Sequence, residues 1–241
     1  MVHMVSVDVQ VQLPKLGLIQ LLRNAEDNQY PAGTPPSLEF VITSKDLTAT
    51  GASATLLVFN NEKGFTSKDL TATGASATLL VFNNEKGFTP ANIESICRVG
   101  KSTKKGCRNR GYIGEKGIGF KSVFLVSSQP HVFSNGYQIR FNEEPCPECN
   151  IGYIVPEWVE DNLMLSNIKQ VYGPSTKLPT TTIILPLKDG KVAAVKQQLS
   201  KMHPEILLFL SKIKQLAVRE ENDDPRLNTV SQPSQVRRML R

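Results

Sequence analysis

The pattern of apolar and polar positions predicts a chain in which helices and strands are mixed. Residues 15–28 carry apolar side chains at helical spacing and predict a helix. Short β-prone runs predict strands at residues 38–43, 131–133, 137–141 and 180–187, and Ser134-Asn135-Gly136 is a hairpin signal between the second and the third. Further helices are predicted at residues 120–127, 191–202 and 204–214. We therefore expect an α+β fold with helices packed on one face of a mixed sheet.

A perfect tandem duplication interrupts this pattern. Residues 44–66 read SKDLTATGASATLLVFNNEKGFT, and residues 67–89 repeat them without a difference. Solenoid repeats diverge and need at least three copies, so a recent duplication or a faulty gene model explains the pair better.

Both copies contain the β-prone run ATLLVF, so both predict a strand. Only the second copy leads into Thr89-Pro90, a favourable helix start, with Ile93 and Ile96 on one face beyond it. We expect the second copy to occupy the sheet, while the first loops out or adds an edge strand. Two identical strands can also compete for one position, which weakens register and invites aggregation.

Composition narrows the class of protein only a little. The chain has 241 residues, 40% of them apolar, and can bury a sizeable core. No run approaches the length of a membrane span and no secretory signal is visible, so we expect a nuclear or cytoplasmic protein without a membrane segment. The net charge of +6 favours anionic partners without choosing among nucleotide, nucleic acid and acidic protein.

Four cysteines fit a reducing compartment. Cys146-Pro147-Glu148-Cys149 has the spacing of a metal-binding knuckle, but a tetrahedral zinc site needs two more ligands. Cys97, Cys107 and His131 are scattered along the chain. The spacing favours a proline-containing turn over a zinc site.

The first candidate site segment lies in the first predicted helix. Gln20, Asn24 and Asp27 share one face of that helix. Oxygen-bearing side chains in such a row can hold a Mg²⁺ ion that keeps most of its waters and bridges to phosphates. Taken alone, the spacing fits a solvated polar stripe better.

The second candidate segment is the glycine-rich run at residues 114–122, GEKGIGFKS, which opens a helix. Glycines let the backbone approach phosphates, and free N–H groups at a helix start attract anions. The run lacks the preceding strand of a Rossmann fingerprint, and Gly100-Lys101-Ser102 lacks the upstream glycine of a P-loop. Its neighbourhood is strongly basic and suits a polyphosphate or nucleic acid, although a solvated loop is the simpler reading. Against one acid, Glu115, stand Lys101, Lys104, Lys105, Arg108, Arg110, Lys116 and Lys121.

The order of these segments is more specific than any one of them. A helix with Asn24, a strand ending in Asn-Asn-x-x-Gly-Phe, a basic glycine-rich loop and a Thr-rich strand follow one another along the chain. This order resembles the GHKL superfamily of ATPases (histidine kinases, DNA gyrase B, MutL and the heat-shock-90 chaperones), and within it the plant No Vein-like proteins, relatives of sacsin. The resemblance covers roughly residues 18–218.

The resemblance implies a two-layer α/β sandwich, the Bergerat ATP-binding fold, and Mg²⁺-dependent binding of ATP. It implies that Asn24 holds Mg²⁺, that Asn84 accepts a hydrogen bond from the adenine amino group, and that Thr181 supports adenine through water. The remaining cofactor-binding residues expected from it are Asp27, Gly87, Lys101, Gly114, Gly117, Ile118, Gly119 and Phe120.

The domain organisation expected from these segments has four parts. Residues 1–17 form an N-terminal segment unlike that of the family, and residues 18–190 form the ATP-binding domain with the duplication. Residues 191–218 continue it as helices, and residues 219–241 are a polar tail that we expect to be disordered.

One departure from the family pattern bears on hydrolysis. The family's catalytic glutamate falls on Gln20, whose amide cannot accept a proton at neutral pH. Loss of a general base costs about 10²–10⁴-fold in rate, and Glu26 faces another side of the helix. We therefore expect weak or lost ATPase activity, and a module that senses ATP by closing a lid at residues 99–116. The alternatives are a nucleic-acid or chromatin-associated adaptor that uses the basic loop, and a non-functional product of a duplicated gene.

Overall fold

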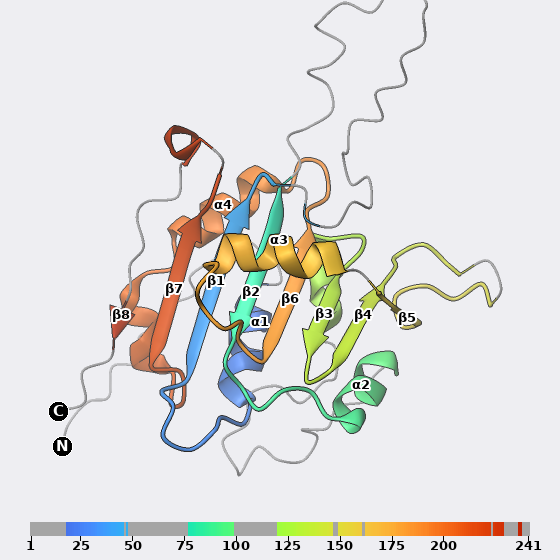
Figure 1. Ribbon diagram of the computed structural model, residues 1–241, viewed down its shortest axis with the longest axis horizontal. Coiled ribbons are helices and arrows are strands. Elements are labelled where there is room, and N and C mark those ends of the chain that lie inside the picture. Colours follow the sequence, from blue (N-terminus) through green and yellow to red (C-terminus); the bar gives the residue numbers. More distant parts are fainter. Residues whose placement is uncertain are drawn as a thin grey trace, which may run out of the picture.

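The computed structural model describes residues 18–45, 47, 77–98, 120–146, 149–160, 162–222, 224–228 and 236–237. Within this part of the chain, one mixed sheet of eight strands has the order β5-β4-β3-β6-β2-β1-β7-β8 (Figure 1). β1 and β7 run parallel, and the other neighbours are antiparallel. The strands are β1 (Ser37–Thr43), β2 (Thr78–Asn83), β3 (His131–Ser134), β4 (Tyr137–Phe141), β5 (Pro156–Trp158), β6 (Thr181–Pro186), β7 (Gln215–Glu220) and β8 (Val236–Arg237).

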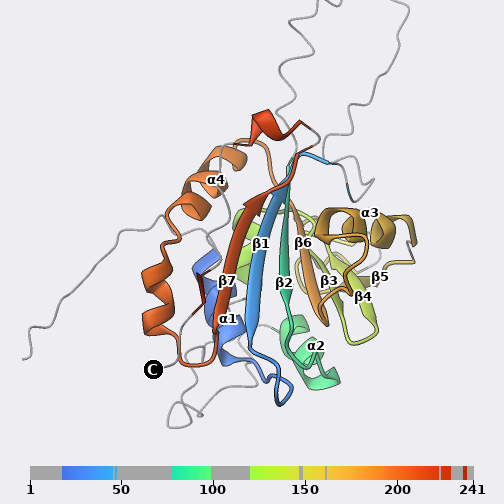
Figure 2. The ribbon, with the colours of Figure 1, turned by 60° about the vertical axis from the view of Figure 1, so that its left-hand side comes forward.

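Helical elements cover both faces of the sheet (Figure 2). Alternate residues of the central strand β2 belong to different apolar clusters, because strand side chains point to opposite faces. α1 (Leu18–Asp27), α4 (Val192–Ser200) and the 3₁₀ helices η2 (Phe120–Leu125) and η3 (Pro204–Phe209) pack on one face, which we call the α1 face. α3 (Asn162–Tyr172) packs on the other.

α3 makes the observed architecture differ from the predicted one. An α+β fold with a mixed sheet is confirmed, but the prediction that helices cover only one face is wrong. Val41, Leu80, Phe82 and Ile184 would be left exposed on a two-layer sheet, and α3 buries them. Among the described residues, no helix combines the length and apolar character needed to cross a lipid bilayer.

The hairpin of β3 and β4 is confirmed as predicted. Asn135 and Gly136, at the turn, have φ angles of 50° and 86°. Two consecutive left-handed residues form the type I′ turn that matches the twist of a two-residue hairpin.

The C-terminal part of the sheet was not predicted. Residues 204–214 were expected to form a helix, but η3 ends at Phe209 and β7 begins at Gln215. β7 buries Leu216, Val218 and Glu220, so the expected helical continuation at 191–218 ends in a strand. The polar tail predicted from residue 219 likewise starts inside β7, which the 3₁₀ turn η4 (Pro225–Leu227) follows.

The second copy of the duplicated segment supplies β2, as predicted. The copy continues into α2 (Pro90–Cys97), where the Thr89 side chain accepts a hydrogen bond from the Asn92 N–H and forms a capping box. The first copy contributes Leu47, which is buried in the cluster beneath α3. Residues 48–76 lie outside the described residues, and so does the expectation that the first copy loops out or adds an edge strand.

Candidate functional site

A row of polar side chains crosses one end of the sheet on the α1 face. β2 and β3 end there and β6 begins there, with Asn83 opposite Thr181 and Thr181 opposite Ser134. Their exposed fractions are only 5%, 2% and 3%. Since the residues two positions away on each strand belong to the cluster under α1, all three side chains point to that face. We call Asn83, Thr181 and Ser134 the polar row.

One atom of the polar row lacks a hydrogen-bond partner within the described part of the chain. Ser134 Oγ and Thr181 Oγ1 are 2.6 Å apart and bond to each other, and the Phe88 N–H donates to Ser134 Oγ at 2.9 Å. Asn83 Oδ1 is buried and accepts no hydrogen bond from the described residues. A buried carbonyl oxygen without a donor costs about 1–3 kcal/mol, so a bound donor that reached this atom would recover that cost.

Tyr30 connects the polar row to the end of α1. Its hydroxyl donates to the Ala25 carbonyl oxygen at 2.7 Å. Burial raises the pKa of the Tyr30 hydroxyl well above its usual value, while the nearby Asn83 side chain lowers this pKa in part. The carboxylates of Glu85 and Glu26 lie near enough to raise this pKa further.

The predicted row on α1 lies close to this connection. Asn24 and Gln20 are half-buried, and Asp27 is almost fully buried at the helix end. Ala25, which receives the Tyr30 hydrogen bond, follows Asn24 directly. The last turn of α1 and the polar row therefore meet at Tyr30, with Gln20 one turn further away.

The Glu26 side chain has a structural role. Its Oε1 accepts hydrogen bonds from the N–H groups of Ser211 and Lys212 at 2.6 and 2.7 Å, and its Oε2 accepts from that of Ile213 at 3.0 Å. A carboxylate held by three backbone donors cannot swing toward another site without leaving them unpaired. Glu26 therefore anchors the segment that leads into β7.

Asn84 does not belong to the polar row, because its side chain bonds to the backbone at the start of β1. Its Oδ1 accepts from the Ser37 N–H at 2.8 Å, and its Nδ2 donates to the Pro35 carbonyl oxygen at 2.9 Å. Asn84 thus secures the start of β1. The residue that faces Thr181 is Asn83, which the sequence reasoning missed. The alternation of side chains along β2 could have identified Asn83, because Asn83 lies two positions after Val81 and so points to the same face of the sheet. A shift of one residue, to Asn84, reverses the face.

Gly87 has a packing role. Its φ angle is 94°, and an added Cβ would lie 2.7 Å from Asn135 Cβ and 2.9 Å from Thr180 Cγ2. Only glycine allows the segment after β2 to lie so close to the β3–β4 turn and to the start of β6.

The other predicted site residues divide into two groups. Phe120 packs on the α1-side cluster, with its ring 5.6 Å from that of Phe141. The cofactor-binding residues predicted from the glycine-rich loop lie outside the described residues: Lys101, Gly114, Gly117, Ile118 and Gly119.

Cys146 belongs to a tight turn, where its carbonyl oxygen accepts from the Asn150 N–H at 2.7 Å. In the part of the chain that the structure describes, no three His, Cys, Asp or Glu side chains are grouped to hold a metal ion.

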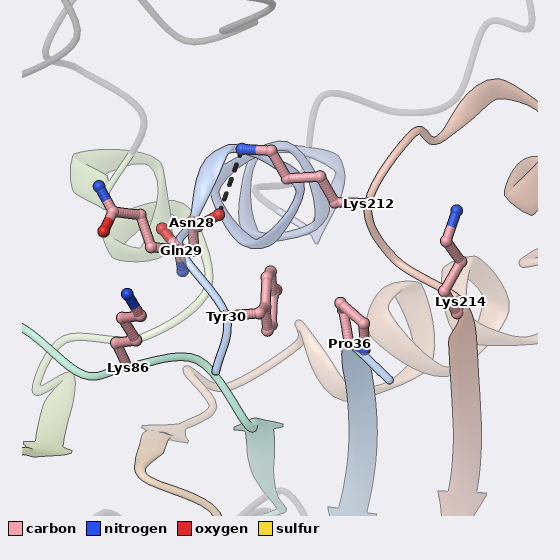
Figure 3. A pocket seen from close by; sticks show the side chains of 7 residues that line it. All are labelled: Asn28, Gln29, Tyr30, Pro36, Lys86, Lys212 and Lys214. Carbon is pink, nitrogen blue, oxygen red and sulfur yellow. Dashed lines mark hydrogen bonds between the residues drawn. The ribbon is translucent and has the colours of Figure 1, made fainter. Parts of the chain in front are cut away.

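A pocket of about 490 Å³ lies beside Tyr30, whose side chain forms part of its lining (Figure 3). Tyr30 stands in it between the end of α1 and Pro36, and the Lys212 ammonium bonds to the Asn28 carbonyl oxygen at 3.2 Å. The lining contains three lysines and no acid, which makes the pocket positive. Its lining residues are Asn28, Gln29, Tyr30, Pro36, Lys86, Lys212 and Lys214.

Comparison with known proteins defines the family. A family model described as the Sacsin domain matches residues 18–144, just over half of the chain, and takes in α1, Asn83 and Ser134. The chain belongs to the Sacsin domain family.

A relative of this chain is protein NO VEIN of Arabidopsis thaliana, 35% identical over 216 residues. The match covers 86% of this chain but 7% of that protein, so the chain corresponds to a small part of its relative. The predicted kinship with sacsin and the No Vein-like proteins is confirmed.

Proposed function

We propose that this chain is an ATP-binding module of the GHKL type, built on the Bergerat fold with α3 added on the second face of the sheet, and with the adenine base bound on the α1 face beside the polar row. The observation that carries the proposal is the buried Oδ1 of Asn83, which lacks a donor among the described residues and lies opposite Thr181. An adenine amino group supplies such a donor. The order of the motifs along the chain supports the same reading.

In this proposal Asn83, rather than Asn84, accepts the hydrogen bond from the adenine amino group. Both ends of the Asn84 amide are already used by the backbone, whereas Asn83 keeps an oxygen for a ligand. The Thr181 hydroxyl stands beside it, where it can bond to the base through water.

The Mg²⁺ ion and the phosphates would be held from α1 and from the glycine-rich loop. Asn24 offers an amide oxygen next to the turn that contacts Tyr30, and the hard oxygen ligands that Mg²⁺ prefers include such groups. Lys101 and the glycines at 114, 117 and 119 remain the expected phosphate contacts.

Hydrolysis is weak or absent in this proposal. Gln20 cannot take a proton from water, and the neighbouring Glu26 is fully engaged with backbone N–H groups. Binding without rapid turnover suits a module that reports the presence of ATP to other parts of a larger protein.

Thermal unfolding with and without Mg²⁺-ATP tests the proposal on the wild type, Asn83→Ala and Asn84→Ala. A ligand at about 100 times its Kd adds about 2.7 kcal/mol to the stability of a protein that binds it. We expect the wild type and Asn84→Ala to gain stability with ATP, although Asn84→Ala starts from a lower Tm. Asn83→Ala should gain little.

If the Tm of the wild type does not change with ATP, the nucleotide proposal is wrong. Loss of the ATP response in Asn84→Ala alone would return the adenine contact to Asn84.

The two alternatives keep their own tests. A nucleic-acid or chromatin adaptor requires steeply salt-dependent binding of DNA that does not respond to ATP. A damaged gene product requires that the full chain fails to fold and that removal of one repeat restores folding.

A further inference from the structure

The pocket beside Tyr30 has a lining of its own, which the proposed function does not use. None of its described lining residues belongs to the polar row or to the predicted row on α1. Its volume of about 490 Å³ lies within the range of small-molecule sites. The chemistry of the lining residues therefore indicates which ligand the pocket can hold.

Two rings form the apolar part of the pocket (Figure 3). The Tyr30 hydroxyl already donates to the Ala25 carbonyl oxygen at 2.7 Å, so Tyr30 offers a ligand mainly its ring. Pro36 has no N–H group, and its carbonyl oxygen accepts from the N–H groups of Lys214 and Gln215 at 2.9 and 3.2 Å. This part of the pocket therefore favours a flat apolar group over a hydrogen-bonding one.

Three lysines are spaced around these rings (Figure 3). Lys86 follows β2, whereas Lys212 and Lys214 precede β7. The buried carboxylates of Glu26 and Glu85 lie nearby but do not belong to the described lining. The lining is therefore positively charged at neutral pH and attracts a ligand that carries more than one negative charge.

Backbone hydrogen bonds hold the segments that carry these lysines. The Lys86 N–H donates to the Gln29 carbonyl oxygen at 2.8 Å, and the Lys214 N–H donates to Pro36 as described above. The Lys214 ammonium also bonds to the Ser211 carbonyl oxygen at 2.7 Å. A carbonyl group neutralises no charge, so this bond orders the ammonium and leaves it positive. Groups that are ordered before binding lower the entropy cost of association.

We propose that this pocket is a second ligand site, which binds a small ring-bearing phosphate monoester of the aryl phosphate type. The ring packs on Tyr30 and Pro36, and the phosphate contacts the lysines, whose ammonium groups bind phosphates as point charges. A phosphate monoester carries a charge of about −1.5 to −2 at neutral pH, so it matches the lining better than a single carboxylate does. The site shares no described residue with the proposed nucleotide site, so this inference does not depend on the proposed function.

Binding of phenyl phosphate to the full chain, followed by NMR with isotope-labelled lysine, tests the inference. Inorganic phosphate has the charge without the ring, and phenol has the ring without the charge. We expect phenyl phosphate to shift the amide signals of the three lining lysines and to bind about tenfold more tightly than inorganic phosphate. Phenol should not bind measurably, and added salt should weaken the binding of phenyl phosphate.

Two substitutions remove charge from the lining without removing the rings. Lys86→Gln and Lys214→Gln should each weaken phenyl phosphate binding by about threefold or more. Lys212 is left in place, because its ammonium bonds to the carbonyl oxygens of residues 27 and 28 at the end of α1. Lys169→Gln replaces an exposed lysine on α3 and is the matched control, which should bind as the wild type does.

The outcomes decide the inference in either direction. Equal affinity for phenyl phosphate and inorganic phosphate overturns it, and so does unchanged binding in a folded double variant of Lys86→Gln and Lys214→Gln. Displacement of phenyl phosphate by Mg²⁺-ATP also overturns it, since the pocket would then belong to the nucleotide site. Shifts that persist under saturating Mg²⁺-ATP support a separate site. The comparison of ligands on the wild type decides alone if a variant does not fold.

Discussion

Neighbouring residues of the same kind do different work in this chain. Asn83 and Asn84 are adjacent asparagines, yet the pleat of β2 turns one toward the α1 face while the other bonds to the backbone before β1. Glu26 and Asp27 are adjacent acids, and both are buried. At the residue scale, function depends on which face a side chain takes more than on its type.

Glu26 offers a direct test of a buried charge with a structural role. Replacement by Ala leaves three backbone N–H groups without their acceptor, and we expect a loss of about 3 kcal/mol in the free energy of unfolding. Glu26→Gln should lose less, because one oxygen still accepts from Ser211 and Lys212. Urea unfolding measures both, with the exposed Glu144→Gln as control. Equal stability of Glu26→Ala and the control would contradict the role.

The raised pKa of the Tyr30 hydroxyl leads us to expect a loss of stability at alkaline pH. Its pKa is raised in the folded state, so the folded protein keeps a proton that the unfolded chain releases above pH about 10. The stability that depends on this neutral hydroxyl is complete below that pH and falls as the pH rises toward the folded pKa. Unfolding of Tyr30→Phe, followed from neutral pH to about pH 11, should show a shallower decline than the wild type. Parallel curves would speak against it.

Gln20 provides the test of impaired hydrolysis. Under the proposed function, Gln20→Glu introduces a group that can accept a proton from water, and we expect ATP turnover to rise by about 10²-fold or more. Release of phosphate under saturating Mg²⁺-ATP measures it, and Asn24→Ala in the same background should abolish the gain. If the wild type hydrolyses ATP as fast as Gln20→Glu does, the hypothesis that Gln20 limits hydrolysis is wrong.

At the scale of elements, local patterns predicted the central strands well. β1, β3, β4 and β6 are runs of β-branched and aromatic residues bounded by turn signals, and each was predicted within about two residues. α3 and β5 fall in a stretch where no clear period was recognised. The predicted helix at 204–214 failed for a non-local reason: Glu26, on α1, captures the N–H groups of residues 211–213, and no local pattern shows this contact.

Gly87 tests the packing of the segment after β2 against the β3–β4 turn. Gly87→Ala introduces both an unfavourable φ and a Cβ that overlaps Asn135 and Thr180, and should cost about 2–4 kcal/mol. Gly190→Ala is the matched control, since its φ is 72° but open space surrounds it. The control should cost about 1 kcal/mol, the conformational part alone. Equal costs would show that the segment moves aside without penalty.

At the scale of the molecule, the sequence predicts candidate residues, and the structure shows which of them lie together. Motif order predicts the α1 row and Thr181, and Thr181 lies opposite Asn83 in the sheet. Motif order also predicts Asn84 rather than Asn83, since a motif does not tell which face a residue takes. Tyr30 belongs to no motif, and its hydrogen bond to the end of α1 is visible only in the structure.

The duplication makes a prediction about the whole chain. Deletion of residues 44–66 and deletion of residues 67–89 yield the same chain, shorter by 23 of the 241 residues. In that chain, the 29 residues between Leu47 and Ala77 become six. We predict that the added residues cost chain entropy alone, at about 1.5 RT ln n for closing a connection of n residues, so that the shorter chain is more stable by about 1.4 kcal/mol. Denaturant unfolding of both chains measures the difference, and a less stable short chain would mean that the extra copy contributes packing.

The added length enters between β1 and β2 at the end of the sheet opposite the polar row, because β1 runs away from that row and β2 returns to it. Six residues of strand, about 20 Å, separate the two places. The 23 added residues thus enter the chain at a point remote from its candidate site. The same point is therefore suited to the insertion of a fluorescent domain. Such a domain would show where this protein lies in a cell without contacting the residues proposed to hold a nucleotide.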